Sequence, residues 1–274
     1  MIDLDLGLVW INRGPLRAAT PQDKRRRLAD LMTAIKRHYT ERRSYYLRLA
    51  PPVADAALAE EALTASGLVA TATPGWASAE LDLAPEVDAL RRGLRSNWRN
   101  TLGKAERGGV AVRSGSDEAT FSAFTAAYDH FLTERDFDTT VTPKLLTTLQ
   151  QLLASDQRLT AFIAERGGEL LGAALISRNG GRAEYLSGFV EEPGRALGAG
   201  QILLWHAVMA MKATGMKVFD LGGMDPDITP RGIYDFKDGL GGKSYRLGAE
   251  REAGGEGLLG RLVRWRVAGA RSAA

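Results

Sequence analysis

The sequence predicts an α/β protein in which amphipathic helices alternate with short strands. Three β-rich segments follow one another at residues 159–166, 169–177 and 182–190, and the pairs Gly167-Gly168 and Gly180-Gly181 separate them as hairpin turns. Apolar residues at spacings of three and four indicate helices on either side of these strands. With 274 residues and 45% hydrophobic side chains, the chain can form one large domain or two smaller ones.

Residues 1–112 are expected to form a small first lobe, whose elements end at breaks introduced by proline and glycine. In chain order these elements are a strand before Asn12, a helix from Thr20-Pro21 to about Tyr39, a strand at 44–49, a helix that ends at Gly67, and a strand pair at 68–73 and 76–83.

A helical pattern from Pro85 to Gly108, broken near Ser96, is expected to bridge this lobe and the next. Its apolar stripe includes Trp98, which we interpret as a core anchor rather than a platform for a nucleic-acid base. Arginines occupy another face of the helix, which is expected to line a cleft. The stripe consists of Leu90, Leu94, Trp98, Leu102 and Ala105, and the arginines are Arg92, Arg95 and Arg99.

Residues 113–256 are expected to form a more complete second domain. Helices at 117–130 and 143–153 precede the three strands, and a helix at 201–214 and a strand at Val218 follow them. The remaining tail, 257–274, has the pattern of a basic amphipathic helix. Such a helix packs its apolar side on the domain or contacts anionic lipid.

Residues 218–242 contain the most informative pattern. A strand at Val218 ends at Gly222-Gly223, where the backbone can approach a substrate closely. A short helix is predicted next, with Thr229-Pro230 as its cap and first turn and Gly239 as a left-handed stop.

On this short helix Tyr234 and Lys237 share one flank. A lysine beside a tyrosine, at the end of a strand and among glycines, is typical of a site for a charged or phosphorylated ligand. The same spacing also occurs on solvated surface helices.

Composition excludes several kinds of chemistry. The chain has no cysteine, so disulfides, thiolate catalysis and zinc–cysteine sites are not available. Its three histidines, His38, His130 and His206, lie far apart in the sequence and predict no metal site. Neither a nucleophilic serine motif nor a Walker loop occurs, which argues against hydrolase and NTPase functions.

Charge and hydropathy bear on partners and location. The formal net charge is only +3, yet the isoelectric point is about 9.2 and basic residues gather in clusters. Such clusters suit a polyanion, although they are also typical of a solvated helix face. The first ten residues lack the basic region of a signal peptide and no apolar run could span a bilayer, so we expect a cytoplasmic protein, with the inner face of the membrane as a further possibility.

Three segments resemble the Fem peptidyltransferases, enzymes that use aminoacyl-tRNA to build peptidoglycan cross-bridges. Phe-Asp-Leu-Gly-Gly at 219–223, followed by Gly-Ile-Tyr-Asp-Phe-Lys-Asp-Gly-Leu-Gly-Gly at 232–242, is similar to the C-terminal motif of that family. Residues 97–113 are similar to its Arg-Asn…Lys-Ala-Glu-Arg-x-Gly-Val motif, and residues 12–15 to its Arg-Gly-Pro motif. Their order and rough spacing fit over most of the chain.

The resemblance implies a fold of two acetyltransferase-like (GNAT) lobes, of which the N-terminal one is reduced here. The helices, antiparallel strands and returning strand predicted for the second half match this topology independently of the motifs. The implied partners are aminoacyl-tRNA and an amine acceptor, which is a peptidoglycan precursor or another peptide or small molecule, and no cofactor is implied.

The resemblance also assigns catalytic candidates. Aminoacyl transfer passes through a tetrahedral oxyanion, which a fixed cation stabilises, and Lys237 matches the family's lysine for that purpose. Tyr234 would hydrogen-bond the substrate or pack on the loop. Asp220 would orient a substrate amine or bond the amides of the following glycine loop.

Substrate-binding candidates follow from the other motifs. Arg99, Lys104 and Arg107 would hold phosphate or the tRNA backbone, or else form salt bridges with Glu106 or with the other lobe. Arg13 is a similar candidate in the first motif. Tyr185, near an aromatic position of the family, would line the cleft.

Two other functions stay open. Arg195, Gly198 and Gly200 fit Arg-x-x-Gly-x-Gly, the pyrophosphate loop of acetyl-CoA-dependent acetyltransferases, and glycine amides at the start of a helix form an anion site. An acyl-CoA-dependent N-acyltransferase is therefore the first alternative. The second is a non-catalytic module that binds RNA or an envelope precursor, against which the presence of Lys237, Tyr234 and the glycine loop argues.

Overall fold

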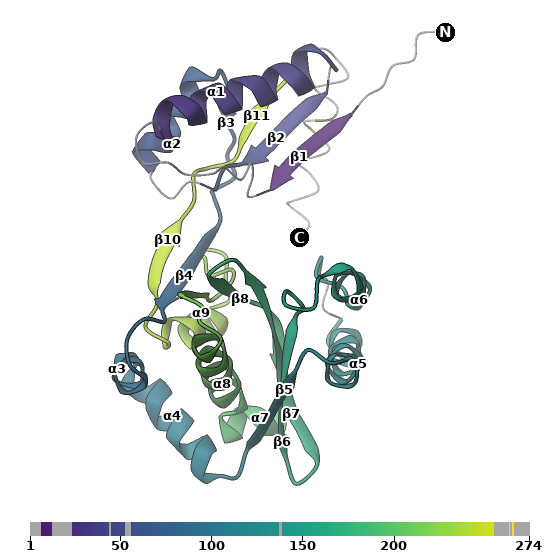
Figure 1. Cartoon of the computed structure of the whole chain (residues 1–274), viewed down its shortest axis with the longest axis vertical. Helices are drawn as coiled ribbons and strands as arrows, with labels where there is room; N and C mark the ends of the chain where they lie inside the picture. The colour runs from purple at the N-terminus through teal and green to yellow at the C-terminus, as the bar shows by residue number, and fades with distance from the viewer. Residues whose placement is uncertain are drawn as a thin grey trace. The chain divides into compact units, whose positions relative to one another are not determined.

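The computed structural model describes residues 7–12, 24–43, 45–52, 56–136, 139–254, 263 and 265. The chain divides into two compact units, one formed by Met1–Ala77 with Tyr245–Ala274 and the other by Ser78–Ser244. The fold is mixed α/β with two sheets, as predicted from the sequence (Figure 1). In the described part of the chain no helix combines the length and apolar character needed to cross a membrane.

The first unit is built on a four-stranded sheet in the order β1-β2-β11-β3. β1 (Leu8–Asn12) and β2 (Tyr46–Ala50) run parallel, while β11 (Arg251–Ala253) pairs antiparallel with both β2 and β3 (Val69–Ala70). α1 (Lys24–Lys36) and α2 (Ala56–Ala65) pack on the face that carries Leu47 and Leu49, and a π-helical turn, η2 (Arg37–Glu41), follows α1. All five residues of β2 are buried.

A buried ion pair crosses the first unit between residues far apart in the sequence. Nε of Arg48 on β2 lies 2.5 Å from a carboxylate oxygen of Glu250, and Arg48 also donates to the Thr73 hydroxyl at 2.7 Å. A buried charge needs such partners because isolated burial is costly.

The second unit contains a seven-stranded sheet in the order β10-β4-β9-β8-β7-β6-β5. Its strands are β4 (Ala77–Asp82), β5 (Ala111–Gly115), β6 (Thr160–Arg166), β7 (Glu169–Asn179), β8 (Arg182–Val190), β9 (Val218–Asp220) and β10 (Lys243–Arg246). The β8–β9 pair is parallel, whereas the pairs β4–β9, β5–β6, β6–β7 and β7–β8 are antiparallel. The predicted hairpins are confirmed, and their turns use positive φ angles at Gly167, Gly168 and Gly180.

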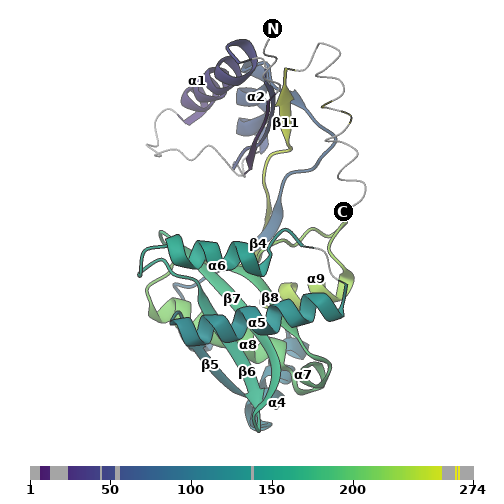
Figure 2. The same ribbon diagram turned by 90° about the vertical axis from the view of Figure 1, so that its right-hand side faces the viewer.

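Helices cover both faces of this sheet. α5 (Glu118–Glu134) and α6 (Pro143–Leu152) pack on one face, where Phe124 and Leu146 are fully buried (Figure 2). α8 (Ala199–Ala213) packs on the other face together with α3 (Val87–Gly93) and α4 (Ser96–Arg107), and α7 (Glu192–Leu197) and α9 (Arg231–Asp238) complete the unit. The predicted break near Ser96 is confirmed, because Leu94 and Arg95 adopt extended backbone angles between α3 and α4.

The two compact units differ from the domains 1–112 and 113–256 predicted from the sequence. α3 and α4 lie within the second unit, because Leu90, Trp98 and Leu102 share one hydrophobic cluster with α8. β11 belongs to the first unit, because it pairs with β2. The expected basic helix at 257–274 and the helix start at Thr20-Pro21 lie outside the described residues.

The strand pair predicted at 68–73 and 76–83 is wrong. β3 pairs with β11 in the first sheet, whereas β4 pairs with β9 in the second. Sequence neighbours joined by a short glycine-containing link suggested a hairpin, but each strand finds its partner more than 100 residues away.

Trp98→Ala is expected to destabilise the second unit by about 3–5 kcal/mol, because the side chain is 3% exposed and its removal leaves a large cavity. Chemical denaturation would measure this loss. Trp265→Ala, at a position 75% exposed, serves as the control and should change stability by less than about 0.5 kcal/mol. A loss below about 1 kcal/mol for Trp98→Ala would contradict a core role for this side chain.

Candidate active site

Helix α9 carries Lys237, and packing against α4 fixes its position. Nε1 of Trp98 donates to the Phe236 carbonyl at 3.0 Å, and the Arg95 amide donates to the Gly239 carbonyl at 2.9 Å. A Cβ atom at Gly239 would lie 2.3 Å from Cδ1 of Trp98, so only glycine allows this contact. Trp98 is thus a core anchor, as the sequence indicated, and it holds the helix that carries the lysine.

The predicted ends of α9 need correction. Gly239 has helical angles, φ −62° and ψ −19°, and the left-handed glycine is Gly241, with φ +77°. Thr229 does not cap the helix: its hydroxyl accepts the Asp225 amide at 2.9 Å, and Pro230 occupies the cap position. The Thr229 side chain closes the preceding loop instead, a competing use that is common for threonine.

Lys237 is buried, with 7% of its surface exposed. Its Nζ atom donates to the Gly223 carbonyl at 2.8 Å and lies 5.3 Å from the centroid of the Tyr185 ring, within cation–π range. Burial lowers the pKa of Lys237 to about 8, while the negative charges of Asp220 and Glu184 act in the opposite direction. Because this pKa lies above 7, the ammonium form predominates at pH 7.

Tyr185 forms one wall beside this ammonium group. The register between β7 and β8 shifts there, since Ile176 pairs with Tyr185 but Leu175 pairs with Ser187, which re-aims the side chains at this point. The Tyr185 hydroxyl lies close to Gly188, where an added Cβ would approach it to 2.4 Å. Burial raises the pKa of this hydroxyl, so it stays protonated at neutral pH.

The whole of β9 pairs with only the first residues of β8, Arg182 to Glu184. The parallel register ends at Glu184 and Asp220, and the chain of β9 then turns through Gly222, whose φ is +69°. A Cβ at Gly222 would lie 2.5 Å from the Tyr185 carbonyl oxygen and 3.6 Å from Nζ of Lys237. Glycine is required there by both the positive φ and the close approach.

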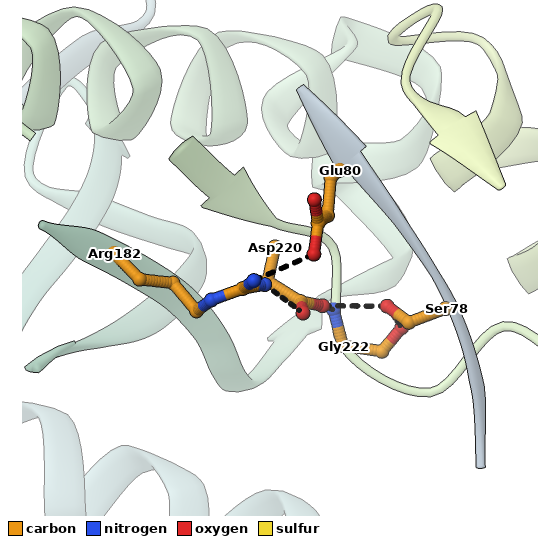
Figure 3. Close-up of polar contacts among 5 residues, drawn as sticks. All are labelled: Ser78, Glu80, Arg182, Asp220 and Gly222. Atoms are coloured by element: carbon orange, nitrogen blue, oxygen red, sulfur yellow. Dashed lines mark hydrogen bonds and ion pairs between the residues drawn. The ribbon is translucent and has the colours of Figure 1, made fainter. Parts of the chain in front are cut away.

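Asp220 comes two residues before Gly222 and is 2% exposed, and Figure 3 shows its side chain between those of Arg182 and Ser78. Its Oδ1 accepts the Gly222 amide at 2.9 Å and lies 2.5 Å from the Ser78 hydroxyl, while Oδ2 lies 3.0 Å from Arg182. Arg182 also reaches Glu80 at 2.6 Å. Of the two roles expected for Asp220, the bond to the glycine-loop amide is therefore present.

The other predicted residues are distributed over several elements. Tyr234 lies one turn before Lys237 and is partly buried against the hydrophobic cluster that contains Trp98 and residues of α8. Arg99 donates to the carbonyl groups of Arg92 and Leu94 at 3.1 Å, while Lys104 and Arg107 lie exposed on α4. Arg13 lies outside the described residues.

The alternative phosphate loop is largely helical. Arg195 lies in α7 and pairs with Glu192 at 3.1 Å. Gly198 adopts φ +73° at the start of α8, where an added Cβ would lie 2.8 Å from Cγ2 of Thr101, and a Cβ at Gly200 would lie 3.2 Å from the Phe236 ring. Both glycines thus allow α4 and α9 to pack closely on α8.

The structure therefore brings together Lys237, Tyr185 and Asp220, and it adds groups that the sequence did not indicate. These are Ser78, Glu80, Arg182, Glu184 and the Gly223 carbonyl. In the sequence the side chains among them look like ordinary polar residues of strands. In the described part of the chain no cluster of three or more His, Asp or Glu residues could hold a metal ion.

This fold and site define an acyltransferase of the GNAT type. A family model described as an acetyltransferase (GNAT) domain matches residues 89–238, and the chain belongs to that family. No curated protein matches the sequence.

Solved structures show the same fold at low sequence identity. A crystal structure of FemX has a TM-score of 0.78 and 15% identity over 97% of this chain and 84% of its own. The C-terminal domain of a candidate lysylphosphatidylglycerol synthetase from Agrobacterium fabrum has a TM-score of 0.57 and 13% identity, covering 89% and 75%. A tandem GNAT protein from the clavulanic acid biosynthesis pathway has a TM-score of 0.53 and 14% identity, covering 86% and 73%.

Lys237→Met is expected to melt at or above the wild-type temperature at pH 7, because the buried charge is removed. The folded-state pKa of about 8 lies below the ordinary 10.5, so between these values the unfolded chain binds more protons and wild type gains stability as pH rises. The variant lacks this gain, so its advantage should shrink between pH 7 and pH 10 in thermal melts. A variant that melts well below wild type at pH 7 would show that the Gly223 hydrogen bond outweighs the cost of burial.

Proposed function

We propose that this protein transfers an aminoacyl group from charged tRNA to an amine acceptor. The observation that carries the proposal is Lys237, a buried ammonium group held beside the turn at which the pairing of β8 with β9 ends. It occupies the lysine position of the Fem-like motif. The similarity to FemX over nearly the whole chain supports the same reaction class.

The reaction needs a cation that stabilises the oxyanion and a group that transfers protons. A neutral acceptor amine attacks the ester carbonyl, and the carbonyl oxygen becomes an oxyanion that the Lys237 ammonium stabilises. When the ester bond breaks, the ribose oxygen takes a proton, and the new amide nitrogen releases one. Lys237, with a pKa of about 8, can give its proton to the ribose oxygen and regain one from the nitrogen.

Charged tRNA is favoured over acyl-CoA as the donor by the structure of the alternative phosphate loop. Of the two glycine amides expected to bind phosphate, that of Gly198 is bonded to the Arg195 carbonyl instead. The two glycines of the loop have a sufficient role in helix packing. Acyl-CoA remains the competing donor, since the family is named for acetyl transfer.

A surface for the tRNA backbone is available on α4. Glu106 is the acidic residue of this helix, and both of its oxygens accept from Arg91, at 2.9 and 2.5 Å, an arrangement that lowers the pKa of Glu106. Lys104 and Arg107 stay exposed. Arg99, in contrast, is occupied by backbone carbonyl groups and contributes to the joint between α3 and α4.

For the acceptor we propose an amine of a peptidoglycan precursor, which the motifs imply. A name that refers to lysylphosphatidylglycerol, among the similar structures, is consistent with aminoacyl transfer as the shared chemistry but points to a different acceptor. The reaction would take place on the cytoplasmic side of the membrane, where charged tRNA is found.

Charged tRNA should bind the protein with an affinity that falls steeply with salt, because phosphate contacts release counterions. Replacing both Lys104 and Arg107 with glutamine should reduce the slope of log affinity against log salt by roughly 1.5. The control replaces Lys144 and Arg158, exposed residues at and beyond α6, in the same way and should leave the slope unchanged. Micromolar binding of acetyl-CoA without measurable tRNA binding at low salt would instead support the acyl-CoA alternative.

Lys237→Met should lower the transfer rate by on the order of a hundredfold, the scale for loss of one oxyanion stabiliser. Because the ammonium form is active, wild-type kcat/KM should fall as pH rises through about 8. Lys243→Met, at an exposed position on β10, is the control and should keep full turnover. Near-normal turnover of Lys237→Met with saturating substrates would exclude this catalytic role.

A further inference from the structure

Asp220 is a carboxylate of the candidate active site, in the second unit. It is almost completely buried, and both of its oxygens are engaged by groups of the protein, as Figure 3 shows. A carboxylate in this state is poorly placed to receive a substrate amine. Its partners come from three strands, Ser78 from β4, Arg182 from β8 and the Gly222 amide just beyond β9.

We propose that Asp220, clamped by Ser78 and Arg182, is a positioning residue for Lys237 that fixes the Gly222-Gly223 turn on which the ammonium group rests. This inference rests on the proposed function, because it assigns residues that support the proposed catalytic lysine. Ser78 and Arg182 thereby become part of the site without touching substrate.

The chain of contacts is short and continuous. Asp220 Oδ1 accepts the amide of Gly222, a side-chain bond to the residue two positions ahead that closes a turn. The Gly222 carbonyl lies 2.7 Å from the Ser78 hydroxyl, so the same serine contacts both Asp220 and the turn. The next carbonyl group, that of Gly223, accepts Lys237 at 2.8 Å.

The turn needs this support because its own backbone does not favour one conformation. Gly222 has no side chain and a positive φ, and glycine loses more conformational freedom on ordering than any other residue. The single proton of Ser78 can serve Asp220 or the Gly222 carbonyl at one time, which ties the two acceptors together. Removing one contact should therefore loosen the turn and let water reach the lysine.

Besides fixing the position of Lys237, this network sets the charge around its ammonium group. The charged groups that face Lys237 are Asp220 from β9 and Glu184 from β8, with the Tyr185 ring on the same strand. From α4, Arg95 pairs with Asp238 of α9. Arg182 lies between Asp220 and Glu80, so it offsets part of the negative charge that Lys237 experiences.

Two substitutions should therefore shift Lys237 in opposite directions. Asp220→Asn keeps an oxygen for Ser78 and the Gly222 amide but loses the negative charge, so the Lys237 titration midpoint should fall by roughly one pH unit. Arg182→Gln leaves Asp220 and Glu80 unopposed and loosens the clamp, and both effects should raise the midpoint. A network with only a structural role would lower the melting temperature and leave the midpoint in place.

The experiment is an NMR titration of protein labelled with ¹³C at the lysine ε carbon, in which the Lys237 signal is identified by its loss in Lys237→Met. The matched control is Arg113→Gln, which breaks an arginine–glutamate pair of 3.1 Å between the strands β5 and β6 at the other edge of the sheet. It should leave the midpoint unchanged. Opposite shifts in the two variants support the proposal, and midpoints equal to wild type in both overturn it.

The titration uses the protein without substrate, so it separates this inference from the proposed reaction. If the Lys237 midpoint shifts in opposite directions in the two variants but wild type transfers no aminoacyl group, the positioning network stands and the proposed function fails. If wild type transfers aminoacyl groups and neither variant moves the midpoint or the alkaline limb of kcat/KM, the function stands and this inference fails. Ser78→Ala gives an independent check, because it changes no charge and should raise the midpoint by loosening the turn.

Discussion

The hydrogen bond from Lys237 to the Gly223 carbonyl is the contact on which the site depends. A lysine side chain in a buried position normally loses its charge or recruits a carboxylate in direct contact. Here the positive charge is stabilised by the Gly223 carbonyl, by the face of the Tyr185 ring and by the nearby carboxylates of Asp220 and Glu184. The result is an ammonium group that is mostly charged at neutral pH yet close enough to its pKa to exchange a proton.

Two further features of the second unit hold the Lys237 ammonium group in place. The Trp98–Gly239 contact fixes how closely α9 packs against α4. The Gly222 turn fixes the position of the Gly223 carbonyl, which accepts the hydrogen bond from Lys237. These two supports come from different parts of the chain, one from α4 and the other from β9 and its neighbours. A change in either would move the lysine relative to Tyr185 and Asp220.

This arrangement also bears on the proposal that a chain of a family named for acetyl transfer uses a different acyl donor. The parallel pair β8–β9 and the helix α8 lie within the residues that the family model matches. Ahead of α8 this chain has a short helix, α7, and the Arg195 and Gly198 amides are bonded to carbonyl groups of the protein. The cation that we propose for catalysis, Lys237, is supplied by α9, which follows α8 and β9 in the chain.

The sequence by itself determined much of the local structure. The glycine pairs predicted the β6–β7–β8 hairpins, the spacing of apolar residues predicted the stripe containing Trp98, and the motif singled out Lys237. These features depend on neighbours within about one turn or one hairpin, which a sequence displays directly. The ends of α9 were predicted less well, because Thr229 and Gly239 have uses that packing decides.

Only the tertiary structure decided which distant residues meet. Ser78 and Asp220 are 142 residues apart, and Trp98 and Phe236 are 138 apart. The return of β11 to the first sheet and the inclusion of α3 and α4 in the second unit are of the same kind. A polar residue in a strand has the same local pattern whether it faces solvent or clamps a buried carboxylate. Its role is set by pairing between strands, which the periodicity of a single segment does not encode.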